Sequence, residues 1–156
     1  MVGGGMDGSF VDKEIDGELF VRWAQTNALM GMMQISISPW RVLNKENSEL
    51  IKKAIELHEE YSGVFYSLAK HASKTGEPIV RHMAYEFPDE GFETENTQFM
   101  LGSDILAAPI IEKGAESRDV RLPLGKWLAS DGKLYDGGKT VTINVPLDKM
   151  VYFKKQ

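Results

Sequence analysis

Hydrophobic positions in the first half of the chain follow the period of a helix in two places. Over residues 16–31, apolar side chains recur every three or four positions between Asp16, which can cap a helix start, and Gly31, which can end one. Residues 47–73 carry the same apolar stripe opposite a charged face, and Gly76 follows it. The pattern therefore predicts two amphipathic helices.

Between these helices the hydrophobic period falls to two residues. Residues 32–38 alternate between apolar and polar side chains, with Gln34 and Ser36 among the polar positions, and this is the period of a strand. Pro39 ends the pattern because it has no N–H to give to a ladder, and Trp40 follows in a predicted loop. The polar face meets either water on an open sheet or the ligand-binding mouth of a barrel.

The second half of the chain has a different pattern of hydrophobic and turn-forming residues. From residue 78 onward, short runs of β-forming residues are separated by turn signals such as Asp131-Gly132. Several strands at this spacing, without helices between them, predict a small antiparallel β-sandwich. The sequence thus predicts an α+β chain of two parts, a helix–strand–helix unit over residues 1–77 and an all-β domain over residues 78–156.

Composition narrows the classes of function. The chain has 156 residues and a formal charge of −5, and its basic residues are interleaved with acids, so nothing favours a nucleic acid partner. The absence of cysteine excludes disulfides and thiolate metal sites. No apolar run approaches the roughly 20 residues that span a bilayer, so no membrane partner is expected. The sequence shows no targeting signal, which leaves the compartment open and is compatible with the cytoplasm.

Few residues have the spacing that a catalytic or metal-binding site requires. The histidines lie in separate segments without ligand spacing, so no metal site is predicted. The acids of residues 87–96 could include a catalytic pair, but a solvated turn suits a loop rich in Gly, Pro and Asn. Trp23 and Trp127 fall within apolar patterns and are expected in the core, whereas Trp40 follows a polar strand end and can face a ligand.

Four motifs occur in a fixed order along the chain. They are Leu-x-x-Arg-Trp-x-Gln at residues 19–25, Gln-Phe-Met-Leu-Gly at 98–102, Ala-Ala-Pro-Ile at 107–110 and Arg-x-Val-x-Leu-Pro-x-Gly-x-Trp at 118–127. With these motifs the sequence resembles the C-terminal portion of glycoside hydrolase family 31 over essentially its whole length. The resemblance implies a (β/α)8 barrel followed by β-sandwich domains, and an activity on the O-glycosidic bonds of α-hexosides such as α-glucosides or α-galactosides.

The same resemblance assigns positions to the predicted elements. Residues 32–38 correspond to the last barrel strand and residues 47–73 to the last barrel helix, so that the first part of the chain is the C-terminal part of the catalytic barrel. Active sites of such barrels lie at the C-terminal ends of the strands. Gln34 and Ser36 are therefore expected to point toward the substrate. The resemblance thus implies that Gln34 and Ser36 bind substrate. The position of Trp40 just after the polar strand end makes it the third candidate, and no cofactor is expected.

The chain departs from the family pattern in two respects. Many α-glucosidases of the family read Arg-x-His where this chain has Gln34 and Ser36, and this version resembles the branch that contains myogenesis-regulating glycosidase, so α-galactosides or other hexosides become possible. The retaining mechanism uses an Asp nucleophile and an Asp acid/base on earlier strands, and neither motif occurs here. Residues 2–4 resemble the end of the seventh strand, so we expect a fragment of a larger protein that holds no catalytic residue and is inactive alone.

A barrel cut after its seventh strand exposes apolar surface, and we therefore expect self-association or a rearranged N-terminal segment. Two other interpretations remain open. The β-rich part could be a non-catalytic module that packs on a catalytic chain or binds carbohydrate beside it; exposed aromatic residues over 78–156 would favour sugar binding, and their burial would favour packing. A stand-alone structural domain would bind no sugar and would have a closed core.

Overall fold

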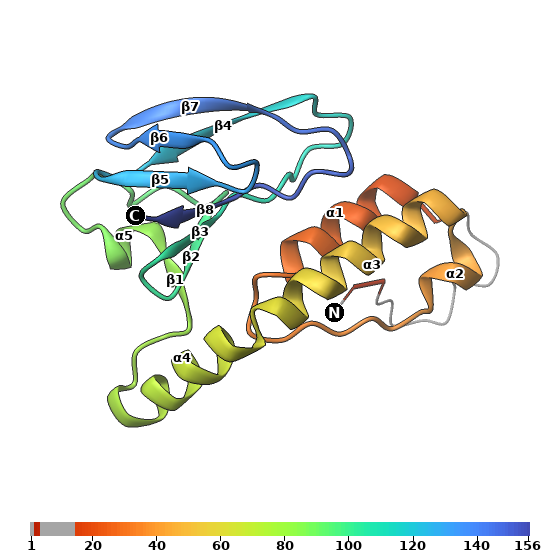
Figure 1. Cartoon of the computed structure of the whole chain (residues 1–156), viewed down its shortest axis with the longest axis horizontal. Helices are drawn as coiled ribbons and strands as arrows, with labels where there is room; N and C mark the ends of the chain where they lie inside the picture. The colour runs from red at the N-terminus through yellow and green to blue at the C-terminus, as the bar shows by residue number, and fades with distance from the viewer. Residues whose placement is uncertain (1, 4–14) are drawn as a thin grey trace. The chain divides into compact units, whose positions relative to one another are not determined.

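The computed structural model describes residues 2, 3 and 15–156 of the chain (Figure 1). These residues pack into two compact units, which divide between residues 62 and 63. The first unit is helical and the second is built mainly from strands. Among the described residues, no helix has the length and apolar character needed to cross a membrane.

The first unit contains the capped helix that the sequence predicts. Helix α1 (Gly17–Asn27) begins after Asp16, whose carboxylate accepts the Leu19 N–H at 3.0 Å, so the predicted cap is confirmed. The helix ends at Asn27, before Gly31, and the Asn27 side chain donates to the Trp23 carbonyl at 2.9 Å. Helix α3 (Lys45–Glu60) packs against α1 and against the short helix α2 (Pro39–Val42). Phe20 and Ala24 of α1 and Ile51 and Ala54 of α3 are buried, so part of each apolar stripe is covered.

The second helical pattern is divided, so the expectation of one continuous helix over residues 47–73 is wrong. Helix α3 ends at Glu60, and α4 (Ser62–Thr75) begins two residues later. Tyr61 between them leaves helical geometry, with φ −87° and ψ 5°, and its side chain is buried. Gly63 lies in the first turn of α4, two residues after Tyr61, and glycine costs about 1 kcal/mol relative to alanine inside a helix. Burial of Tyr61 and the weak propensity beside it account for the break.

Residues 32–38 do not form the predicted strand. The described residues show an isolated parallel bridge between Val2 and Ile35, in which Val2 N donates to Gln34 O at 2.7 Å and Ser36 N donates to Val2 O at 3.0 Å. A regular ladder needs longer pairing than this bridge supplies. The predicted alternation is nevertheless present, because Ile35 is half-buried whereas Gln34 and Ser36 are exposed.

The second unit is built from two antiparallel sheets, as the sequence predicts (Figure 1). The larger sheet has the strand order β1-β2-β3-β8-β5-β6. Its strands are β1 (Val80–His82), β2 (Phe99–Leu101), β3 (Ile105–Ala107), β5 (Lys126–Ala129), β6 (Leu134–Asp136) and β8 (Tyr152–Lys155). The smaller sheet pairs β4 (Ser117–Leu122) with β7 (Lys139–Asn144). One helical turn, α5 (Met83–Glu86), interrupts the β-rich part, where the sequence predicted strands alone.

Turn residues join these strands where the sequence places them. Asp131 and Gly132 connect β5 to β6, and Gly132 has φ +82°, a left-handed conformation that glycine adopts without strain. Gly138 has φ +73° in the turn before β7. Side chains from both sheets form one apolar cluster, which includes Met83, Phe87, Phe92, Met100, Leu106, Val120, Leu122, Trp127, Ile143 and Phe153.

The three tryptophans have different environments. Trp127 on β5 is fully buried, lies edge-on to Phe87 with a centroid distance of 6.2 Å, and donates its Nε1–H to the Pro123 carbonyl at 2.8 Å, so its predicted place in the core is confirmed. Trp23 is 37% exposed, so its predicted burial is wrong. A helical stripe shows which residues share a face but not how much of that face is covered. Trp40 is 74% exposed, but it lies on α2 and not in the predicted loop, because Pro39 is preorganised for the first position of this short helix.

Candidate functional site

The segment with the predicted substrate contacts carries its polar side chains on one exposed side. Gln34 and Ser36 are exposed, and alternate positions of an extended segment point the same way. The Ser36 hydroxyl lies 3.2 Å from the Val2 carbonyl, to which it donates, and its oxygen keeps acceptor capacity. Pro39 is buried and begins α2, which holds Trp40 outward four residues after Ser36. The segment therefore offers an amide, a hydroxyl and an indole to solvent.

Close packing fixes the backbone next to this segment. Gly3 has φ +69°, and a Cβ at that position would lie 2.7 Å from a ring carbon of Phe20 and 2.9 Å from a methyl of Ile37. Both the conformation and the contacts therefore require glycine. The glycine follows Val2, whose N–H and C=O hold Gln34 and Ser36 through backbone hydrogen bonds.

Two of the acids in residues 87–96 accept hydrogen bonds from groups of the protein itself. Glu90 Oε2 accepts the Leu124 N–H at 2.8 Å, and Glu95 Oε1 accepts the N–H and the hydroxyl of Thr97 at 2.8 and 2.6 Å. Asp89 and Glu93 are exposed. Glu95 therefore caps its own loop, and Glu90 ties this loop to the turn before β5. Both carboxylates have structural partners, so the structural interpretation of the cluster is the better one.

The histidines are also engaged separately. His58 Nδ1 lies 3.0 Å from the Ala28 carbonyl, His71 Nε2 lies 3.3 Å from Glu77, and His82 accepts the Ala84 N–H at the start of α5. Within the described part of the chain, no three His, Asp or Glu side chains gather as metal ligands.

The motif at residues 118–127 has a structural explanation in the sandwich. Along β4, Val120 and Leu122 are buried, and Arg118 shares their inward face. Pro123 directly follows the end of β4, and its carbonyl accepts the indole N–H of Trp127. Gly125 between them has φ +117°, which side chains rarely tolerate. The spacing Arg-x-Val-x-Leu-Pro-x-Gly-x-Trp is thus the pattern of one strand and the turn that closes on it.

The motif at residues 98–102 meets the same strand. The buried Gln98 side chain donates to the Arg121 carbonyl at 2.7 Å and accepts the Arg121 N–H at 3.2 Å. It therefore replaces a neighbouring strand at the edge of β4. Gly102 has φ +60° and lies against Leu68 of α4, where a Cβ would approach a methyl to 2.9 Å. The motifs that carry the resemblance thus mainly build the sandwich.

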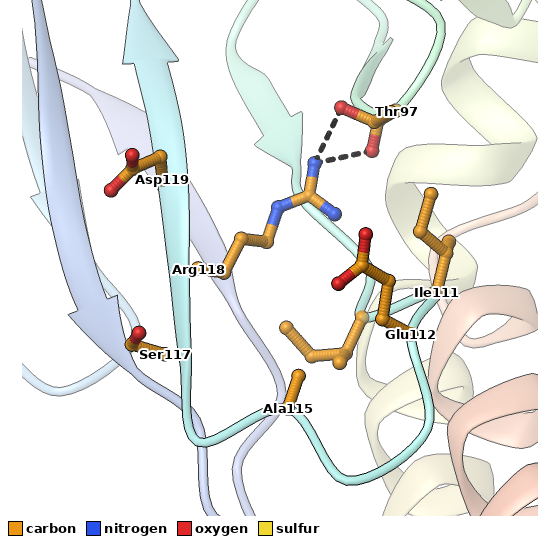
Figure 2. Close-up of a pocket in the computed structure, with 8 residues that line it drawn as sticks. Thr97, Ile111, Glu112, Ala115, Ser117, Arg118 and Asp119 are labelled. Atoms are coloured by element: carbon orange, nitrogen blue, oxygen red, sulfur yellow. Dashed lines mark hydrogen bonds between the residues drawn. The ribbon is translucent and has the colours of Figure 1, made fainter.

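Arg118 lines a pocket of about 230 Å³, together with neighbours on β4, Thr97 and residues of the segment 110–115 (Figure 2). Its Nη2 donates to the carbonyl of Thr97 at 2.5 Å and to the Thr97 hydroxyl at 3.0 Å, and its Nη1 donates to the Pro109 carbonyl. Figure 2 shows the guanidinium reaching Thr97, with the Glu112 carboxylate beside it. The arginine therefore joins three segments that are distant in sequence.

Burial governs the electrostatics of this group. Loss of solvent lowers the pKa of Arg118, and the carboxylates of Glu95 and Glu112 oppose that shift. The Arg118 Nε is buried and has no hydrogen-bond partner among the described residues. The sequence places Arg118 at the head of a motif but does not reveal these bonds, because Thr97 and Pro109 lie in other segments. The only signal is a basic residue at an inward position of a strand.

The family model for the glycosyl hydrolase family 31 C-terminal domain matches residues 76–156. The chain belongs to glycoside hydrolase family 31. Myogenesis-regulating glycosidase of Mus musculus is 36% identical over 140 residues, which are 87% of this chain and 19% of that protein. Neutral alpha-glucosidase C of Homo sapiens is 34% identical over 150 residues, 88% of this chain and 16% of that protein. The family predicted from the motifs is therefore confirmed.

Solved structures of family 31 enzymes share the fold. A GH31 alpha-xylosidase from a soil metagenome, complexed with xylose, superposes with a TM-score of 0.80 at 27% identity over 90% of this chain and 25% of that chain. A GH31 dextranase of Flavobacterium johnsoniae, complexed with isomaltotriose, gives 0.79 at 32% identity over 89% of this chain and 18% of that chain. The chain spans about a fifth or less of the length of the curated relatives named above.

Proposed function

We propose that this chain supplies the last part of the catalytic barrel, over residues 1–77, and the following β-sandwich, over residues 78–156, of a retaining α-glycosidase. Its family membership supports hydrolysis of O-glycosidic bonds by the whole protein. The parallel bridge between Val2 and Ile35 carries the barrel assignment, because neighbouring strands of such a barrel run parallel. The close packing at Gly3 supports the same arrangement.

In this proposal the chain binds substrate and other strands perform the chemistry. Retaining hydrolysis needs two carboxyl groups about 5–5.5 Å apart, one as nucleophile and one as acid/base. The chain contributes the Gln34 amide and the Ser36 hydroxyl, which hold sugar hydroxyl groups through neutral hydrogen bonds. The exposed indole of Trp40 covers an apolar face of the sugar. These contacts orient the anomeric carbon and exclude water from one side.

The same residues set the expected specificity. The resemblance places an Arg-x-His pair of many α-glucosidases at Gln34 and Ser36. A serine is shorter than a histidine and carries no charge, so a hydroxyl group of the sugar must reach further or have a different configuration. We propose that the whole protein accepts an α-galactoside or a modified hexoside at least as well as an α-glucoside.

The first prediction concerns activity. The purified chain should not hydrolyse nitrophenyl α-hexosides, because it lacks the catalytic carboxylates, whereas the full-length parent should hydrolyse them. In the parent, Gln34→Ala and Ser36→Ala should each lower kcat/KM about tenfold, the effect of one lost hydrogen bond. Initial rates on a panel of α-glucoside, α-galactoside and α-xyloside substrates measure this.

The control in the parent is Ser117→Ala, an exposed serine of β4 in the sandwich. Turnover by the isolated chain, abolished by Ser36→Ala, would contradict the proposed division of labour. A parent that hydrolyses α-glucosides best would leave the family assignment intact and refute the specificity argument. A parent without any α-glycosidase activity would refute the proposed function.

Aromatic burial bears on the non-catalytic alternative. Phe87, Phe92, Trp127 and Phe153 are all buried in the sandwich, and Tyr85 is the large aromatic side chain that stands out at 53% exposure. A flat sugar-binding platform needs several exposed rings on one face. The burial of these four rings therefore favours a packing role for them, and the described rings form no flat platform on a sheet face.

We also propose that the isolated chain self-associates through its helical unit. Large apolar side chains are exposed there, notably Leu19, Met32 and Trp40. Light scattering should give a mass above the monomer that rises with concentration, and the double change Met32→Ser with Trp40→Ser should lower it. The matched change Leu134→Ser, at an exposed position of the sandwich, should have no effect. A constant monomer mass over a wide concentration range would refute the proposal.

A further inference from the structure

A second hollow lies in the sandwich, away from Arg118. It has a volume of about 420 Å³ and is bounded by the turn after β5 and by residues 146–152. Its polar lining comes from Ser130, Asp131, Asp148 and Lys149, and its apolar surface comes from Pro146, Met150 and Tyr152. No motif in the sequence points to this place, because its two sides are separated along the chain.

The two sides are joined rigidly. Ser130 N donates to the Tyr152 carbonyl at 2.9 Å, and the Ser130 hydroxyl donates to the Met150 carbonyl at 2.7 Å. Lys149 N donates to the Pro146 carbonyl at 3.0 Å, which closes the turn that carries this lysine. The backbone therefore fixes the hollow before any ligand arrives, and a preformed site loses little entropy on binding.

An ion pair lines the hollow. Lys149 Nζ donates to Asp131 Oδ2 at 3.2 Å, and the two side chains are 23% and 25% exposed. Asp131 Oδ1 accepts the Lys133 N–H at 3.2 Å. Each carboxylate oxygen keeps a further lone pair, and the ammonium has three N–H donors. A charged acceptor and a charged donor thus stand side by side with bonding capacity toward the hollow.

The carboxylate stays ionised at neutral pH. Burial by itself raises the pKa of Asp131, but the hydrogen bond from Lys133 and the hydrogen bond and charge of Lys149 outweigh it and hold the pKa below its usual range. An ionised carboxylate is an acceptor only, and its hydrogen bonds are stronger than those between neutral groups.

We propose that this hollow binds a neutral sugar ring through two adjacent hydroxyl groups. One hydroxyl donates to Asp131, and its neighbour accepts from Lys149. A small anion would meet the carboxylates of Asp131 and Asp148, and a cation would meet the ammonium, whereas a neutral diol satisfies both members of the pair. The ring face lies against Tyr152 and Pro146, which is the combination of apolar wall and few polar groups that suits small-molecule sites.

The volume agrees with this ligand class. Small-molecule pockets occupy about 300–1,000 Å³, and the hollow of about 420 Å³ lies at the lower end. A single hexose unit or a short end of an oligosaccharide is therefore the fitting size. The choice of an α-hexoside as the probe rests on the proposed function, but binding here does not require the barrel to be active.

The test is a titration of the purified chain with methyl α-glucoside and methyl α-galactoside, followed by amide chemical shifts. The shifts should move at residues 130–133 and 146–152 and saturate. Asp131→Asn keeps an acceptor for the Lys133 N–H but removes the charge, and it should weaken binding about tenfold. Lys149→Met should weaken it similarly, and each variant's thermal midpoint shows that it is folded.

The control variant is Asp136→Asn on β6, which carries an exposed carboxylate outside the hollow and should bind as the original chain does. Shifts that do not move with either sugar would overturn the proposal, as would equal binding by folded Asp131→Asn. Failure here with hydrolysis by the full-length parent would leave the proposed function standing. Sugar binding here without hydrolysis by the full-length parent would support this site and refute the proposed function.

Discussion

Replacement of Trp127 by alanine is expected to destabilise the β-sandwich by about 3–5 kcal/mol, the range for a large aromatic side chain removed from a core. Trp127 is fully buried and packs edge-on against Phe87. Its removal leaves a cavity between the two sheets and also deprives the Pro123 carbonyl of the indole N–H. Such a loss is a large fraction of the stability of an ordinary domain.

Urea denaturation followed by circular dichroism measures this effect. Trp127→Phe fills most of the cavity but still loses the hydrogen bond, so its loss should be smaller than that of the alanine variant. The matched control is Trp40→Ala, which removes an indole that is 74% exposed and should change the unfolding free energy by less than about 0.5 kcal/mol. Equal losses at the two tryptophans would contradict the described core.

Local chemistry explains which elements the sequence predicts well. Asp16 caps α1, and Asp131-Gly132 forms the turn between β5 and β6. Both features are predictable because each depends on hydrogen bonds to residues three or fewer positions away. The sandwich follows from the repeated alternation of short strands and turns. These features depend on a few neighbouring residues, so the printed sequence contains nearly all of the information.

Features that depend on distant partners are predicted poorly. Residues 32–38 have the period of a strand, but a strand also needs a neighbouring strand to pair with. Among the described residues this segment pairs through a single bridge, between Val2 and Ile35. Tyr61 lies within a good helical pattern, and its burial interrupts the helix. Trp23 has the position of a core residue, yet its exposure depends on what covers that face.

The same limit applies to the functional residues. A resemblance and a local pattern point to Gln34, Ser36 and Trp40, and all three side chains are exposed. The pairing of Asp131 with Lys149, by contrast, joins residues 18 positions apart. Composition and spacing carry no signal for such a pair, because any exposed acid and lysine look alike along the sequence.

Replacement of Arg118 by methionine is expected to cost the sandwich about 2–4 kcal/mol, because the Thr97 and Pro109 carbonyls each lose a charged donor and an unsatisfied buried group costs about 1–3 kcal/mol. Methionine has a similar length and keeps most of the apolar contact, so the loss reports on the hydrogen bonds. Arg118→Lys should recover only part of the stability, since an ammonium lacks the planar fork that reaches both carbonyls at once.

The matched control is Arg121→Met on the outer face of the same strand. Arg121 also donates to backbone carbonyls, those of Glu90 and Gly91, but these bonds are exposed, and water replaces the lost donor. Its loss should therefore be about 1 kcal/mol or less. Urea denaturation of the three variants compares them directly. An Arg118→Met chain as stable as Arg121→Met would mean that water reaches the Thr97 and Pro109 carbonyls, and that the buried guanidinium does not hold these segments to β4.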